Sequence, residues 1–149
     1  MPNLQRLQFS IRIHAPVARV WELMLAPESY RDWTSAFMEG SYFEGSWEQG
    51  QRIRFLGPGG TDGMLAEVAE NRRHAFISLR HIGFIAGGKD DTESEQVRAA
   101  LPAHENYSFK AVPEGTELVI DQEISPDYAA MMSEMWPKAL ARLKALCEA

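Results

Sequence analysis

The feature that most constrains this chain is a central region of alternating polar and apolar residues, which one long amphipathic segment follows. Between residues 41 and 123, apolar side chains recur at every second position in short runs that Gly, Pro and Asn separate. A period of two is typical of half-buried strands, and short runs at this spacing predict an antiparallel meander. The expected strands cover residues 7–13, 41–45, 52–56, 64–69, 76–81, 107–111 and 118–123.

Helical spacing of apolar residues occurs after the first strand and again at the end of the chain. Apolar side chains three and four positions apart predict short helices over residues 17–25 and 27–33. Further on, Ser125 is a candidate N-cap and Pro126 suits the first position of a long final helix. Pro137 lies inside this helix and predicts a kink just before it, because proline removes a backbone hydrogen bond.

The final helix is the only element long enough to cover the apolar face of the predicted sheet. At about 1.5 Å per residue, twenty residues span roughly 30 Å. We therefore predict a single α+β domain over residues 1–149, in which a curved antiparallel sheet wraps around the C-terminal helix and two short helices follow the first strand. A small molecule could bind between sheet and helix. The side chains expected to be buried are Trp21, Trp136, Leu140 and Leu143.

Composition excludes several classes of protein. The net charge is −6, which argues against a nucleic-acid binder. A single cysteine, Cys147, excludes an intramolecular disulfide and a multi-cysteine zinc site, and its place on the apolar helix stripe indicates an inert core thiol. No apolar run approaches a membrane span of roughly 18 residues. The four histidines lack metal-ligand spacing, so we expect no metal or cofactor. Taken together, these features lead us to expect a soluble cytoplasmic protein.

Two connecting segments are unusual in composition. Residues 57–63 are rich in glycine, and we interpret them as a hairpin loop that could form a rim around a cavity. Residues 87–103 are acidic, and we interpret them as a solvated loop rather than a partner-binding patch. Thr92 and Glu95 have the spacing of a capping box, which predicts a short helix over residues 93–101.

Motifs along almost the whole chain resemble those of a known superfamily. They are Ala15-Pro16 with Val20-Trp21, Pro27-Glu28 with Trp33, Trp47 and Gly50 before Ile53-Arg54-Phe55, Gly63 before Glu67-Val68, Glu105-Asn106-Tyr107-Ser108-Phe109 before Gly115-Thr116-Glu117-Leu118, and Trp136-Pro137-Lys138-Ala139-Leu140 before Leu143-Lys144-Ala145-Leu146. In order and spacing they resemble the SRPBCC superfamily with its helix-grip fold, related to START and pollen-allergen domains. The closer match is the branch named after the activator of the heat-shock-protein-90 ATPase. The resemblance implies a binding cavity and leaves its contents open.

Candidate cavity residues fall into an apolar and a polar set. Aromatic and methionine side chains suit an apolar pocket of irregular shape, although each could equally fill the core. The apolar candidates are Trp33, Phe37, Phe55, Met64, Met131, Met132 and Met135.

The polar candidates are His81, Glu105 and Tyr107. His81 lies on the apolar side of its predicted strand, and Glu105 and Tyr107 share one face of the next. If these strands pair around the acidic segment, the three side chains approach one another. They could orient a ligand, or act as a general base with a hydrogen-bond donor, or form a structural hydrogen-bonded trio.

Three functions follow as hypotheses. The first is binding of a small apolar or amphipathic molecule between sheet and helix. The second is an enzyme of the cyclase or dehydratase type that uses the polar groups of the same cavity. The third, which the branch name suggests, is a co-chaperone of a heat-shock ATPase. In the proteins that named the branch this domain is joined to a separate N-terminal domain, for which 149 residues leave no room. We also consider a homodimer.

Overall fold

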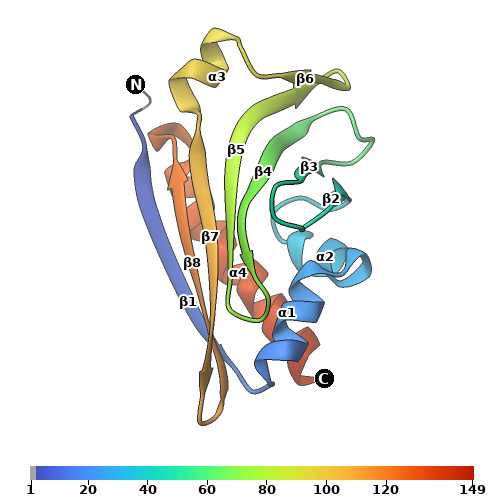
Figure 1. The fold of residues 1–149 in the computed structure, drawn as a ribbon, viewed down its shortest axis with the longest axis vertical. Helices are drawn as coiled ribbons and strands as arrows, with labels where there is room; N and C mark the ends of the chain where they lie inside the picture. Colours follow the sequence, from blue (N-terminus) through green and yellow to red (C-terminus); the bar gives the residue numbers. More distant parts are fainter. Residues whose placement is uncertain (1–2) are drawn as a thin grey trace.

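A computed structural model describes residues 3–149, which form eight strands and four helices (Figure 1). The strands pair antiparallel in one sheet with the order β1-β8-β7-β5-β4-β3-β2, and β6 pairs with β5 outside this path. The elements are β1 (Gln5–Ile13), α1 (Val17–Leu25), α2 (Pro27–Thr34), β2 (Tyr42–Gly45), β3 (Arg52–Leu56), β4 (Gly63–Arg72), β5 (Phe76–Ala86), β6 (Lys89–Asp91), α3 (Glu95–Ala100), β7 (Ala103–Val112), β8 (Gly115–Ile124) and α4 (Pro126–Glu148). The predicted helix-grip α+β fold is confirmed.

The two short helices form a corner that indole hydrogen bonds hold in place. Pro27 occupies the start of α2, as predicted. The Trp33 indole N–H donates to the carbonyl oxygen of Met24 at 3.0 Å, and the Trp47 indole N–H donates to that of Leu25 at 3.1 Å. These bonds occupy carbonyl groups that the end of α1 leaves without helical partners. The corner therefore presents the aromatic side chains of α2 towards the sheet.

The pairing of β4 with β5 contains two irregularities that bend the strands. Leu65 pairs with Gly83 while Ala66 pairs with His81, so that Ile82 is an extra residue on β5. A second shift falls between Val68 and Glu70. Bulges of this kind bend a strand and increase its local twist.

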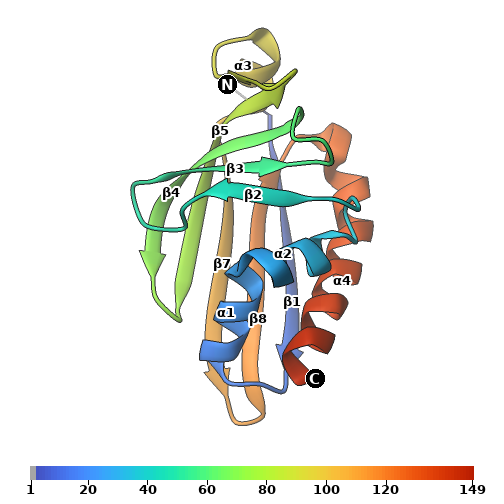
Figure 2. The ribbon, with the colours of Figure 1, turned by 90° about the vertical axis from the view of Figure 1, so that its right-hand side faces the viewer.

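The long final helix covers the curved sheet beside β1 and contacts α1 and α2 (Figure 2). As predicted, Trp136, Leu140 and Leu143 are buried. The remaining buried side chains of α4 are Ala129, Ala139 and Cys147.

Three predictions about the helices need correction or remain open. Trp21 of α1 is only half-buried, because it packs edge-on against Phe109 at the margin of the core. Ser125 occupies the N-cap position of α4, but its side chain makes no capping hydrogen bond. The helix continues through Pro137 without interruption, so it does not open locally there, and a bend of its axis stays a prediction.

The acidic segment is more ordered than the sequence suggested. Residues 89–91 form β6, which pairs with the end of β5 beyond the reach of β7. The Asp91 carboxylate accepts hydrogen bonds from the backbone N–H groups of Glu93 and Ser94 at 3.1 and 3.0 Å. Ser94, and not Thr92, caps the short helix, which therefore starts two residues later than expected. The acidic side chains Asp90, Glu93 and Glu95 are exposed, as expected for a solvated segment, but Val97 and Leu101 are buried, so the segment is not a plain loop.

Candidate functional site

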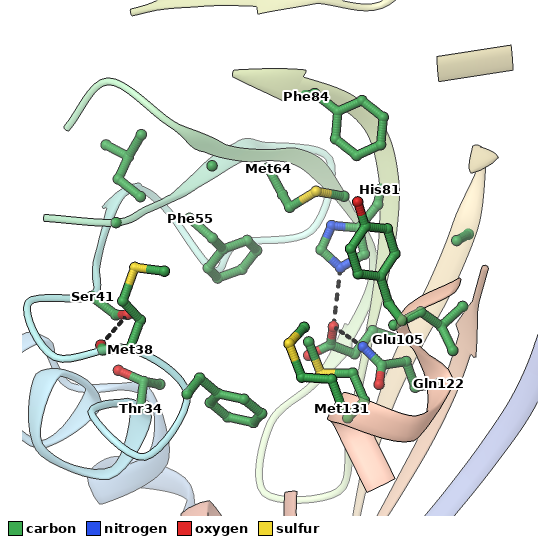
Figure 3. A pocket seen from close by; sticks show the side chains of 18 of the residues that line it. Thr34, Met38, Ser41, Phe55, Met64, His81, Phe84, Glu105, Gln122 and Met131 are labelled. Atoms are coloured by element: carbon green, nitrogen blue, oxygen red, sulfur yellow. Dashed lines mark hydrogen bonds and ion pairs between the residues drawn. The ribbon is translucent and has the colours of Figure 1, made fainter. Parts of the chain in front are cut away.

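A cavity of about 610 Å³ lies between the sheet, α2 and the N-terminal half of α4. The side chains around it come from elements that are distant in sequence (Figure 3). Phe55 and Met64 face it from the paired strands β3 and β4, and Met131 faces it from α4. Ala100 and Leu101, at the end of α3, contribute to its lining, so the acidic segment helps to enclose the cavity.

Nine of the ten predicted site residues line this cavity. They are Trp33, Phe37, Phe55, Met64, His81, Glu105, Tyr107, Met131 and Met132. Met135 does not line it, although it is half-buried. The cavity includes Met132 and Trp136 on one side of α4, and Met135 lies about 100° around the helix from Trp136. The prediction from helical spacing alone therefore assigned one side chain of α4 too many to the cavity.

The polar candidates form one connected cluster in the cavity wall. β5 pairs with β7 so that Glu105 lies opposite Leu79 and therefore diagonal to His81. Oε1 of Glu105 lies 3.1 Å from Nε2 of His81 and accepts a hydrogen bond from Nε2 of Gln122 at 3.3 Å. The Tyr107 hydroxyl donates to Oε2 of the same carboxylate. The expected approach of His81, Glu105 and Tyr107 is therefore present.

Burial and hydrogen bonding act in opposite directions on the carboxyl group at the centre. Burial by itself raises the pKa of Glu105, because the apolar surroundings disfavour the charge. Hydrogen bonds from His81, Tyr107 and Gln122, together with the electrostatic interaction with His81, outweigh this effect, and the net pKa is lowered. Burial, followed by the nearby charge of Glu105, raises the pKa of both Tyr107 and Tyr30. The cavity wall thus holds a carboxylate and two neutral phenols.

Two members of the cluster were missed by sequence reasoning. Gln122 lies opposite Glu105 in the pairing of β7 with β8. Its Oε1 accepts a hydrogen bond from the indole N–H of Trp136 at 2.9 Å, which ties the sheet to α4. A signal was available for Gln122, because it shares the inward face of its strand with Leu118 and Ile120. Trp136 was assigned only to the core.

The mouth of the cavity is marked by apolar side chains that remain exposed. Met38, Tyr128 and Met131 all line the cavity and are 56, 54 and 41 % exposed. The loop between β3 and β4 adds Gly57, Pro58 and Asp62 to the lining. This placement agrees with the expected rim formed by the glycine-rich segment.

The remaining candidate chemistries find little support in the structure. Within residues 3–149, no three or more His, Cys, Asp or Glu side chains are grouped so as to hold a metal ion. Burial raises the pKa of Cys147 to about 11, which leaves its thiol protonated and unreactive. In the same part of the chain, no helix combines the length and apolar character needed to cross a bilayer.

The curved sheet, its long covering helix and the cavity between them define a helix-grip protein of the SRPBCC superfamily. More narrowly, the family model described as "Activator of Hsp90 ATPase homolog 1-like protein" matches residues 14–148, and the chain belongs to this family. No curated protein sequence matches the chain.

Solved structures share this fold at low sequence identity. Protein CV1439 from Chromobacterium violaceum is 20 % identical with a TM-score of 0.69, and the match covers 97 % of each chain. Protein MLL2253 from Mesorhizobium loti is 16 % identical with a TM-score of 0.72, covering 95 % of this chain and 96 % of the other. DynU16, described as a putative protein in the dynemicin biosynthetic locus, is 17 % identical with a TM-score of 0.66, covering 94 % of this chain and 46 % of the other. These likenesses show the fold alone.

Proposed function

We propose that this protein binds a small, largely apolar molecule in the cavity between the sheet and α4. The observation that carries this proposal is a cavity of about 610 Å³ with aromatic and methionine walls and one buried polar cluster. Ligand sites are typically concave and mostly apolar, with a few polar groups that fix orientation. A side chain cluster that only filled a core would leave no such volume, because protein interiors are close-packed.

The composition of the walls favours a ligand with rings or other flat apolar parts. Tyr30 and Phe55 stack with ring centroids 6.1 Å apart, and Phe37 lies edge-on to Trp136 at 4.9 Å. Aromatic rings in such arrangements offer both faces and edges to a further ring. The likeness to a protein from a biosynthetic locus agrees with a small-molecule ligand.

A second candidate is an enzyme of the cyclase or dehydratase type that works in the same cavity. The hydrogen bond between His81 and Glu105 favours it, because a carboxylate that orients an imidazole is the arrangement of a general base. Turnover of a cyclisable substrate by the wild type, lost in His81→Phe, would distinguish catalysis from binding alone.

A pair of matched substitutions on α4 tests the binding proposal. Met132 lines the cavity and Met135 does not, although both are half-buried methionines of the same helix. The test titrates wild type, Met132→Trp and Met135→Trp with the neutral fluorescent probe N-phenyl-1-naphthylamine. A tryptophan at position 132 should fill part of the cavity and weaken binding about tenfold or more, whereas Met135→Trp should bind like wild type.

Circular dichroism and thermal unfolding establish that both variants remain folded. Absence of probe binding to the wild type would refute the proposal. Equal probe affinity in Met132→Trp and Met135→Trp would place the binding site outside this cavity and would refute it as well.

A further inference from the structure

One nitrogen atom in the polar wall has no hydrogen-bond partner. Nδ1 of His81 is buried and has no hydrogen-bond partner, and the whole residue, which lines the cavity, is only 8 % exposed. The other two buried side-chain atoms without a partner in residues 3–149 belong to Arg54 and Asn106, neither of which lines the main cavity. Buried polar groups normally have partners, so an orphaned nitrogen on a cavity wall points to a ligand group.

Two groups fix the directions of the hydrogen bonds in the cluster: one can only donate and the other can only accept. The Trp136 indole has no acceptor, so Gln122 presents its carbonyl oxygen to Trp136 and its amide nitrogen to Glu105. The Glu105 carboxylate only accepts, so Nε2 of His81 carries a proton and donates it. Nδ1 is therefore left either with a lone pair in neutral His81 or with a proton in the imidazolium.

Charge around the cavity restricts what Nδ1 meets. Among the described residues, no lysine or arginine lines the cavity, whereas Glu105, Glu123 and Asp62 do. The other titratable groups that face the cavity are phenols: Tyr30 from α2, Tyr107 from β7 and Tyr128 from α4. An anion that arrives without a proton meets a net negative wall when His81 is neutral. A ligand with its own acidic proton can donate a hydrogen bond to the lone pair of Nδ1, for which the His81–Glu105 pair offers no donor.

Resting on the proposed function, we infer that the ligand is an apolar molecule with a weakly acidic hydroxyl, a phenol or an enol, and that this hydroxyl binds Nδ1 of His81. A neutral hydroxyl on neutral His81 and an oxyanion on the imidazolium contain the same atoms and the same single proton. Moving between them breaks the O–H bond, forms the Nδ1–H bond and leaves the electron pair on oxygen. Both forms satisfy the orphaned nitrogen, and in both Glu105 supports the ring from the other side.

Three probes with one naphthalene body test this inference. 2-Naphthol offers the acidic hydroxyl, 2-methylnaphthalene replaces it with a methyl group of similar size, and 2-acetonaphthone offers only an acceptor. A cavity without a polar partner would prefer the methyl compound, because the hydroxyl loses its hydration. We expect the wild type to bind 2-naphthol about tenfold more tightly than either comparator, measured by calorimetry.

A matched pair of histidine variants assigns the preference to one residue. His104 also pairs with a glutamate, Glu123, but lies 44 % exposed outside the main cavity. We expect His81→Phe to abolish the preference for 2-naphthol while retaining affinity for 2-methylnaphthalene within about threefold. His104→Phe should keep the preference of the wild type.

A measurement on the wild type keeps the test informative even if His81→Phe does not fold. The ¹⁵N chemical shift of Nδ1 of His81 should move on addition of 2-naphthol and stay in place with 2-methylnaphthalene. Equal affinities for the three probes, or tighter binding of 2-acetonaphthone, would overturn the inference and leave the binding proposal standing. If none of the probes binds, both fail.

Discussion

The inner wall and the mouth of the cavity are built in different ways. The wall takes His81, Glu105 and Gln122 from three neighbouring strands, and hydrogen bonds join them to one another and to Trp136. The mouth comes from loops and helix ends, and apolar side chains there, such as Met38, remain exposed. Because strand register fixes the positions of its side chains, the wall is suited to recognising a specific ligand. The mouth is suited to letting a ligand enter.

The first prediction concerns the packing of α4, the helix that covers the sheet and holds the cavity wall in place. Leu143 is fully buried on α4, so Leu143→Ala should lower the free energy of unfolding by about 2–5 kcal/mol. Urea denaturation measures the loss, with the exposed Lys138→Ala on the same helix as the control. A loss below about 0.5 kcal/mol would mean that α4 does not form the core and would contradict the helix-grip architecture.

Strand periodicity explains why most of the wall was predictable. A period of two places Ile77, Leu79 and His81 on one face, and the structure confirms that this face is inward. The same rule places Glu105 with Tyr107. Gln122 obeys the rule too, but a polar residue at the end of the apolar series of Leu118 and Ile120 also fits a strand end that faces solvent.

Periodicity fails where the backbone departs from regular geometry. The extra residue Ile82 shifts the alternation of β5, so that Phe84 lines the cavity together with His81. An isolated glycine inside a strand, here Gly83, is typical of a bulge, but the sequence does not give the register at which the bulge falls. Met38 and Asp62 reach the mouth from irregular loops, whose course depends on tertiary contacts.

The second prediction concerns the charge at the centre of the wall. Glu105→Gln should lower the free energy of unfolding by about 1.5–3 kcal/mol at pH 7, since charge-assisted hydrogen bonds are lost. The pKa of Glu105 lies below its ordinary value of 4.5 in the folded protein, so the folded state binds this proton more weakly than the unfolded chain. The stabilisation is therefore complete above the unfolded-state pKa and is lost as the pH falls through the folded-state pKa.

Denaturant titrations between pH 7 and pH 3 measure this effect. The difference between wild type and Glu105→Gln should narrow below about pH 4.5, the ordinary pKa of the group. Glu123→Gln removes an exposed partner of His104 and should cost less than about 1 kcal/mol. A difference for Glu105→Gln that is constant with pH would show that its charge adds no stability.

The third prediction separates the supporting role of Tyr107 from direct ligand contact. The Tyr107 hydroxyl donates to Glu105, so Tyr107→Phe should lower the free energy of unfolding by about 0.5–1.5 kcal/mol. Because that hydroxyl is already paired, the affinity for 2-naphthol should change by less than about threefold. Calorimetry and urea denaturation on the same preparation measure both quantities. A loss of affinity as large as in His81→Phe would assign the ligand contact to Tyr107 instead.

The last prediction addresses the mouth, where we expect the smallest effect on stability. Met38 is 56 % exposed, and an exposed side chain contributes little to folding, so Met38→Ser should change the free energy of unfolding by less than about 0.5 kcal/mol. Its sulfur lies close to Gly57 of the opposing loop, where it narrows the entrance. We therefore expect faster association and faster dissociation of N-phenyl-1-naphthylamine in stopped-flow fluorescence, with little change in affinity. Unchanged rates together with a loss of stability above 1 kcal/mol would show that Met38 belongs to the core, and the distinction between a structural wall and an open mouth would fail there.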